Sequence, residues 1–151
     1  RLALPDLLGE LDRLVRGGAA VRDAAYPFVL TAGERRSFTA NTIIRDPAWR
    51  KKDGGGALRI NPLDAAALGV ATGQSVRLTT RRDSLIVAIE LTDTMQRGHV
   101  ALPNGLGLGY PGSDGDVTTG IAPNELTATE DRDPFVGTPW HKHVPARVER
   151  A

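Results

Sequence analysis

The chain has 151 residues, 40% of them hydrophobic, which is enough apolar content for one compact core. Its 19 Lys and Arg residues nearly balance its 18 Asp and Glu residues, so no net field attracts nucleic acid or a membrane. The absence of cysteine excludes disulfides, cysteine–zinc sites, iron–sulfur clusters and a thiol nucleophile. We expect one soluble domain in the cytoplasm, with neither nucleic acid nor a membrane as a partner.

The N-terminal residues predict an amphipathic helix. Apolar residues recur every three or four positions from Leu4 to Val15, Pro5 suits a first turn, and Gly17 ends the pattern. We expect residues 1–25 to be a connector helix and linker from a preceding domain, and 26–151 to be the main domain. Because the chain does not begin with methionine, we expect it to be a fragment of a longer protein.

A short β-prone run opens the main domain. Tyr26–Thr31 predicts a strand, and Ala32-Gly33 is expected to stop it before a polar loop over 34–41. Residues 45–56 contain several turn-forming residues and predict an exposed surface loop.

The strongest local signal is a short helix with both ends marked. It follows the β-prone Leu58–Ile60, with Asn61 as N-cap, Pro62 at the first helical position and Asp64 in the first turn. Gly69 is placed where a left-handed C-terminal cap is needed. These residues predict a helix of about two turns.

The rest of the domain predicts mainly β structure. Alternating apolar residues over 76–80 and 85–91 predict a hairpin, and Val100 and Leu102 predict a strand before Pro103. A glycine-rich tract over 104–120 predicts a long loop, order resumes at 124–127, Asp133-Pro134 predicts a turn, and 142–148 predicts a closing strand. Many short strands with two short helices favour a barrel.

Three patterns were considered as a nucleotide site, a metal site and a serine nucleophile, and the neighbouring residues argue against each. Gly105, Gly107 and Gly109 resemble a dinucleotide fingerprint, but Tyr110-Pro111-Gly112 forbids the helix that such a site requires, which leaves a flexible loop. His141 and His143, with His99, suggest a metal site, but no cysteine or suitably spaced carboxylate joins them, so we expect no metal. No serine lies in a nucleophile elbow, so we expect no catalytic residues; the serines considered are Ser37, Ser75, Ser84 and Ser113.

Two basic clusters are candidates for phosphate contact, because guanidinium groups bind phosphate oxygens through paired hydrogen bonds. The cluster Arg50-Lys51-Lys52 lies in the glycine-rich 45–56 segment, and we expect it to be solvated. Arg35-Arg36 follows a buried strand and lies beside Ser37 and Thr39, which supply donors and acceptors, so a polar-ligand loop and a solvated loop are both open there.

A series of short motifs, in the same order, resembles the C-terminal molybdopterin dinucleotide-binding domain of the dimethyl sulfoxide reductase family of molybdopterin oxidoreductases, formate dehydrogenases above all. The resemblance covers residues 26–149. The motifs are Tyr26–Thr31 with its polar loop, Ile60-Asn61-Pro62-x-Asp64-Ala65, Leu68-Gly69-Val70 followed by Gly73-Gln74-x-Val76, Asn124-Glu125-Leu126-Thr127, Asp133-Pro134, Thr138-Pro139, Lys142, and Ala146-Arg147-Val148-Glu149.

The resemblance implies a double-psi β-barrel of about six strands, with short helices beside the N-terminal connector helix. It implies a domain that closes over a bis-molybdopterin guanine dinucleotide cofactor, whose molybdenum or tungsten is held by other domains of the same catalytic subunit. By itself the domain would not be catalytic, whereas the parent protein would be an oxidoreductase. The cofactor contacts implied by position are Gly33, Glu34, Arg35, Ser37, Phe38, Thr39, Asn124 and Lys142.

The residue types suit these implied roles. An amide such as Asn124 both donates to and accepts from a pterin edge, Lys142 offsets anionic charge, and the hydroxyls of Ser37 and Thr39 bond diphosphate oxygens. The alternative from another class is a free-standing double-psi barrel that acts as a protein-interaction module.

Overall fold

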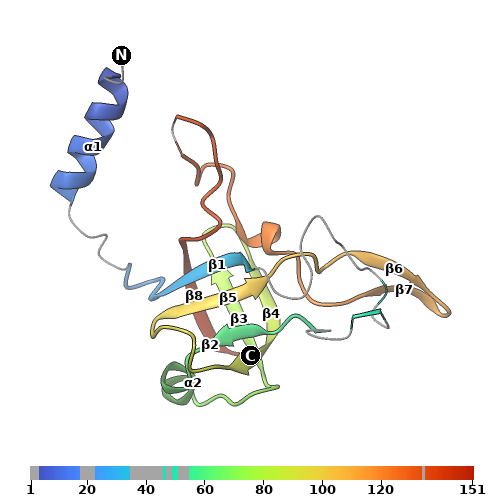
Figure 1. Cartoon of the computed structure of the whole chain (residues 1–151). Helices are drawn as coiled ribbons and strands as arrows, with labels where there is room; N and C mark the ends of the chain where they lie inside the picture. The colour runs from blue at the N-terminus through green and yellow to red at the C-terminus, as the bar shows by residue number, and fades with distance from the viewer. Residues whose placement is uncertain (1–3, 18–22, 35–45, 47–48, 51–54, 134) are drawn as a thin grey trace.

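The computed structural model describes residues 4–17, 23–34, 46, 49–50, 55–133 and 135–151. A closed barrel in the order β1-β5-β2-β4-β3-β8 forms the body, a two-stranded hairpin β6–β7 projects from it, and α1 lies apart (Figure 1). The elements are α1 (Pro5–Gly17), β1 (Phe28–Glu34), β2 (Leu58–Ile60), α2 (Pro62–Leu68), β3 (Ser75–Thr80), β4 (Ser84–Leu91), β5 (His99–Pro103), β6 (Gly109–Gly112), β7 (Gly115–Thr118), the 3-10 helix η2 (Pro123–Leu126) and β8 (Val144–Arg150).

Two parallel strand pairs distinguish this barrel from a simple meander. β1 runs parallel to β5, with Leu30 beside Val100, and β2 runs parallel to β4, with Leu58 beside Ile89. The other neighbours are antiparallel, and β8 closes the barrel by pairing with both β1 and β3. The mainly β fold and the double-psi barrel expected from the sequence are confirmed.

Alternation along the strands fills the barrel with aliphatic side chains. In β3, Val76 and Leu78 are fully buried while Ser75 and Arg77 face solvent. The same period-two pattern brings inward-facing residues of all six strands into one cluster, and this burial is the main stabilising term of the fold.

The short helix α2 forms as its sequence predicts. The side chain of Asn61 accepts a hydrogen bond from the Leu63 N–H at 2.9 Å, and its amide donates to the Met95 carbonyl at 2.7 Å. Gly69 ends the helix at φ 67°, in the left-handed region. The buried Asp64 carboxylate accepts a hydrogen bond from the Gly98 N–H at 2.6 Å and so holds α2 against the turn before β5.

Two predicted strand boundaries are wrong. β1 continues through Gly33 to Glu34, because its pairing with β5 continues there; Gly33, at φ 92°, absorbs a register shift. β8 begins at Val144, so Lys142 and His143 lie before the strand and not in it.

The prediction of one long loop over 104–120 is also wrong. β6 and β7 pair antiparallel within it, with Gly112 opposite Gly115 across a two-residue turn. Leu106, just before the hairpin, is buried at 2% exposure, which shows that the start of this tract belongs to the core.

Arg50 was expected to be solvated, and this expectation is wrong. It is only 7% exposed, and its guanidinium donates to the hydroxyl of Thr119, just after the hairpin. Burial lowers the pKa of Arg50, and the neighbouring Asp46 carboxylate opposes that shift. Lys51 and Lys52 lie outside the described residues.

Candidate functional site

A pocket of about 520 Å³ lies where β1 ends, and we call it the β1-end pocket. Four segments far apart in the sequence form its walls: the end of β1, the glycine-rich tract after β5, the turn into η2 and the segment before β8. Its lining residues are Ala32, Gly33, Asn104, Gly105, Leu106, Leu108, Ala122, Pro123, Asn124, His141 and Lys142. Gly33, Asn124 and Lys142, three of the predicted contacts, therefore lie around one cavity.

Backbone hydrogen bonds hold these walls together. The Ala32 N–H donates to the His141 carbonyl at 2.7 Å, and the Asn104 N–H donates to the Glu34 carbonyl at 3.2 Å. The Gly107 N–H donates to the Thr119 carbonyl at 2.9 Å. These bonds join the walls through the backbone of the protein itself, which reduces the ordering cost of binding.

Asn104 is the polar group that the sequence did not indicate. Its side-chain Oδ1 is buried and has no hydrogen-bond partner among the described residues, although it belongs to the pocket wall. An unpaired buried acceptor is unfavourable and is usually satisfied by a ligand or water. In the sequence, Pro103-Asn104-Gly105 is typical of a turn, and only the pairing of β1 with β5 brings this amide to the pocket.

The charge of the lining favours an anionic ligand. Lys142 is exposed at the rim, His141 lies beside it, and no carboxylate is found among the described lining residues. The guanidinium of Arg82 donates to the carbonyls of Asn124, at 2.8 Å, and of Thr127, and so fixes the turn. The Asn124 side-chain amide makes no hydrogen bond with a described residue, and it lines the pocket with both a donor and an acceptor.

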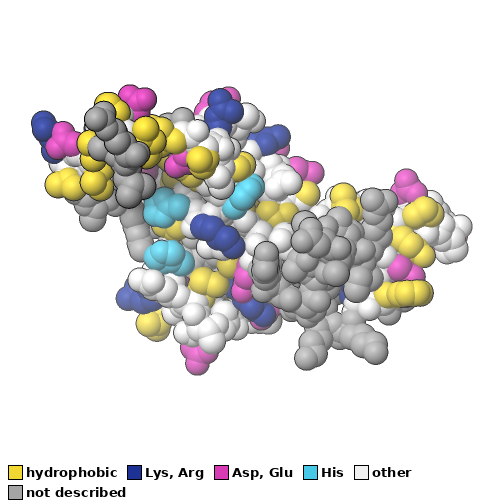
Figure 2. Space-filling model, turned by 45° about the horizontal axis from the view of Figure 1, so that its top comes forward, with side chains coloured by type: hydrophobic (Ala, Val, Ile, Leu, Met, Phe, Trp, Pro, Cys, Tyr) yellow, Lys and Arg dark blue, Asp and Glu magenta, His cyan; other side chains and the backbone are white. Residues whose placement is uncertain are grey.

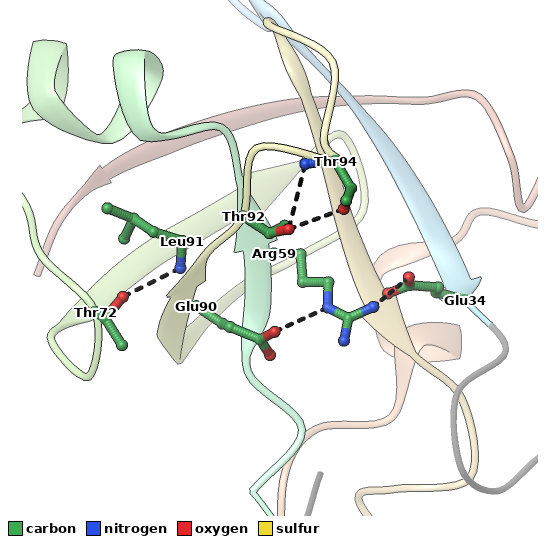
Figure 3. A network of polar contacts seen from close by, with 7 residues as sticks. All are labelled: Glu34, Arg59, Thr72, Glu90, Leu91, Thr92 and Thr94. Carbon is green, nitrogen blue, oxygen red and sulfur yellow. Dashed lines mark hydrogen bonds and ion pairs between the residues drawn. The ribbon is translucent and has the colours of Figure 1, made fainter.

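Glu34 has a different environment. Its carboxylate accepts a hydrogen bond from Arg59 at 2.9 Å, and Arg59 also donates to Glu90 at 3.1 Å, so the guanidinium joins β1, β2 and β4 (Figure 3). Burial lowers the pKa of Arg59, but the two carboxylates outweigh it and the pKa is raised. The Glu34 side chain does not line the β1-end pocket. Arg35, Ser37, Phe38 and Thr39 lie outside the described residues.

The chain's three histidines lie on one face, with a basic side chain between them (Figure 2). Within the described ranges, no group of three His, Asp or Glu side chains is arranged to hold a metal ion. His141 lines the β1-end pocket, whereas His99 and His143 line a separate pocket. Among the described residues, no helix has both the length and the apolar character needed to span a lipid bilayer.

Comparison with known proteins matches this chain to one domain family and to parts of several larger enzymes. Residues 28–145 match the family model described as the molydopterin dinucleotide binding domain. The chain is 32% identical over 93 residues to the periplasmic nitrate reductase of Desulfovibrio desulfuricans, covering 60% of this chain and 12% of that protein. It is 25% identical over 130 residues to the F420-dependent formate dehydrogenase 1 subunit alpha of Methanococcus maripaludis, covering 85% and 17% respectively.

A biotin sulfoxide reductase of Cereibacter sphaeroides is 32% identical over 77 residues, covering 51% of this chain and 10% of that protein. Among solved structures, acetylene hydratase from Pelobacter acetylenicus superposes with a TM-score of 0.65 at 16% identity, over 84% of this chain and 19% of that one, and this likeness shows the fold alone. The chain thus spans less than a fifth of each relative. It belongs to the family of molybdopterin dinucleotide-binding domains found in molybdopterin oxidoreductases of the dimethyl sulfoxide reductase family.

Proposed function

We propose that the β1-end pocket binds the pterin and diphosphate portion of a bis-molybdopterin guanine dinucleotide cofactor. The observation that carries this proposal is the buried, unpaired Oδ1 of Asn104 in a pocket whose described lining has Lys142 and no carboxylate. A pterin edge offers several N–H donors, and a diphosphate is anionic. The Asn104 acceptor therefore suits the pterin edge, and the Lys142 ammonium suits the diphosphate.

The residues present fit this group in size and in chemistry. A volume of about 520 Å³ lies within the range of ligand pockets, roughly 300–1,000 Å³. Gly33 and Gly105 line the pocket without a side chain in the way, Asn124 offers both a donor and an acceptor, and the Lys142 ammonium would neutralise phosphate. When bound, the cofactor supplies a molybdenum or tungsten centre for redox chemistry.

Glu34 and the predicted loop residues Arg35, Ser37, Phe38 and Thr39 remain proposed contacts of the same cofactor. They continue the chain directly from Gly33, which lines the pocket. Glu34 adjoins Gly33 but does not itself line the pocket, and its carboxylate and its carbonyl are already hydrogen-bonded to Arg59 and to the Asn104 N–H.

We further propose that the chain is the C-terminal domain of a formate dehydrogenase-like catalytic subunit and is not catalytic alone. Its partners would be the remaining domains of that subunit, which fits a chain that covers 12% and 17% of two curated relatives. Residues 1–25 would be the connector, because the apolar face of α1 is uncovered, with Leu11 58% and Val15 75% exposed. We propose the cytoplasm as the location, and the periplasmic relative makes the periplasm the alternative that cell fractionation tests.

The test measures cofactor content in the parent protein. Lys142→Gln and Asn104→Leu each remove one ligand contact, worth about 1–3 kcal/mol or roughly a 5- to 150-fold loss of affinity. Molybdenum or tungsten and acid-released guanine nucleotide per protein should therefore fall in both variants. Arg147→Gln is the matched control, because Arg147 is exposed on β8, pairs with Glu149 and lines neither pocket.

Unchanged cofactor content in both pocket variants would overturn the binding-site assignment. It would then favour the interaction-module alternative. An Asn104→Ser variant, which keeps an uncharged oxygen acceptor in the pocket wall, should retain more cofactor than Asn104→Leu. Equal loss in the two Asn104 variants would count against the hydrogen-bond explanation.

A further inference from the structure

A basic side chain on the outer face of the barrel connects three strands beside the β1-end pocket. Arg59 lies on β2 between the fully buried Leu58 and Ile60, so its side chain points outward. Its Nη1 lies 2.9 Å from Oε1 of Glu34 on β1, and its Nε lies 3.1 Å from Oε1 of Glu90 on β4 (Figure 3). The barrel order places β5 between β2 and β1. The guanidinium therefore reaches across a whole strand to the end of β1.

The strand that Arg59 crosses has a small side chain at the crossing point. Ala101 of β5 is opposite Arg59 in the antiparallel register with β2, and opposite Thr31 in the parallel register with β1. Residues opposite each other share one face of a sheet, so the Ala101 methyl group lies on the outer face with Arg59. It is nevertheless only 3% exposed. A short side chain here leaves room for the guanidinium to reach Glu34.

The residue that Arg59 holds is joined directly to the pocket wall. Glu34 is the last residue of β1 and follows the register shift at Gly33. Its carbonyl accepts a hydrogen bond from the Asn104 N–H at 3.2 Å. A Cβ added to Gly33 would lie 3.5 Å from Cβ of Asn104, so the asparagine side chain packs against the Gly33 backbone. Glu34 thus connects Arg59, through its carboxylate, with Asn104, through its carbonyl.

The end of β1 depends on this connection because its strand pairing is weak there. After the register shift, Glu34 is paired with Pro103, which has no N–H to donate to the ladder. The Arg59–Glu34 ion pair is partly buried, with side chains 26% and 24% exposed, and a charge-assisted hydrogen bond of this kind is stronger than a neutral one. The ion pair therefore stabilises a strand end that the ladder alone holds poorly.

We infer that Arg59 is a positioning residue of the β1-end pocket, which fixes Glu34 and through it holds Gly33 and Asn104 in the pocket wall. Arg59 lies outside the pocket lining and acts on it only through Glu34. The consequence for a bound cofactor rests on the proposed function. The consequence for the wall itself does not.

The first experiment measures amide hydrogen exchange by NMR in the whole chain without ligand. In Arg59→Gln, the Asn104 N–H should exchange about tenfold faster, because local opening of the β1 end becomes easier. The Gly107 N–H, bonded to the Thr119 carbonyl at 2.9 Å between the lining residues Leu106 and Leu108, should keep its rate. Equal acceleration of both amides would indicate general loosening of the fold. That result, or an unchanged Asn104 rate, would overturn the inference.

Milder variants test the same connection if Arg59→Gln does not fold. Arg59→Lys keeps the charge but lacks the planar fork that contacts two carboxylates, and Glu90→Gln weakens only one of the two contacts. Each should accelerate Asn104 exchange about threefold. Arg147→Gln is the matched control, since it removes another arginine–glutamate pair, Arg147 with Glu149 at 3.0 Å, on β8. Wild-type Asn104 exchange in both milder variants would refute the positioning role.

A double-mutant cycle tests the route through Glu34. In a Glu34→Ala background, Arg59→Gln should have no further effect on Asn104 exchange, because the connecting carboxylate is already absent. An undiminished effect of Arg59→Gln in that background would show that Arg59 does not act through Glu34.

The second experiment measures bound metal and guanine nucleotide per protein in the parent protein. Arg59→Gln should lower this content about three- to tenfold, and should add little to the loss already caused by Asn104→Leu. Full additivity of the two losses would refute positioning through Asn104 even if the pocket binds the cofactor. Wild-type content in Asn104→Leu would instead refute the proposed ligand contact of Asn104, while the exchange result for the wall would stand.

Discussion

Substitution of Gly107 by alanine tests how the wall of the β1-end pocket is built. Gly107 has φ 76°, and an added Cβ would lie 2.2 Å from the Ala122 backbone nitrogen and 2.8 Å from the Ile121 carbonyl carbon. The left-handed conformation costs alanine about 1–2 kcal/mol, and the clash with main-chain atoms costs about 1–3 kcal/mol. We expect Gly107→Ala to lower the free energy of unfolding by about 2–5 kcal/mol in urea denaturation, a large part of a typical 5–15 kcal/mol.

Gly73 is the matched control. Its φ of 85° imposes the same conformational penalty, but nothing lies within 4 Å of an added Cβ. Gly73→Ala should therefore lose only about 1–2 kcal/mol, and the difference between the two variants isolates the close approach of the two chain segments. Equal losses in the two variants would show that the segments around Gly107 and Ala122 are not packed as described.

Three further predictions concern single contacts. Asn61→Ala removes the α2 N-cap and should lower the free energy of unfolding by about 1–2 kcal/mol in urea denaturation, whereas Asn61→Ser, which can still cap, should lose less. Asp64→Ala leaves the part-buried Gly98 N–H without its acceptor and should cost about 1–3 kcal/mol by the same measurement; no loss would exclude this contact as a stabilising one. The hydrogen bond from Tyr110 to the Asp46 carboxylate raises the pKa of Tyr110, so its small stabilisation is present below the ordinary tyrosine pKa and is lost as pH rises through the raised one. Ultraviolet titration should show Tyr110 ionising at higher pH than in Asp46→Asn, and identical titration curves would contradict this.

The parts of the fold that the sequence predicts are those with local determinants. α2 begins and ends where Asn61 and Gly69 place its caps, since both signals act within a few residues. The extension of β1 through Gly33 depends on β5, about seventy residues later, and the burial of Arg50 depends on Thr119. Neither dependence can be recognised from neighbouring residues.

The candidate site divides in the same way. The family resemblance indicated Gly33, Asn124 and Lys142, which line one pocket. A family pattern carries information about residues far apart in the sequence, which local patterns lack. Asn104 was missed because an asparagine before glycine is typical of a turn. Its importance appears only when the barrel leaves its Oδ1 buried and unpaired.

The closure of the barrel by β8 has a consequence for biosynthesis. Until residues up to Arg150 have left the ribosome, β1 and β3 both lack their β8 partner and present open edges, which are prone to pair with other chains. The Lys142 wall of the pocket is translated in the same late interval. The barrel and the wall of the β1-end pocket are therefore completed together, by the last part of this chain to be made.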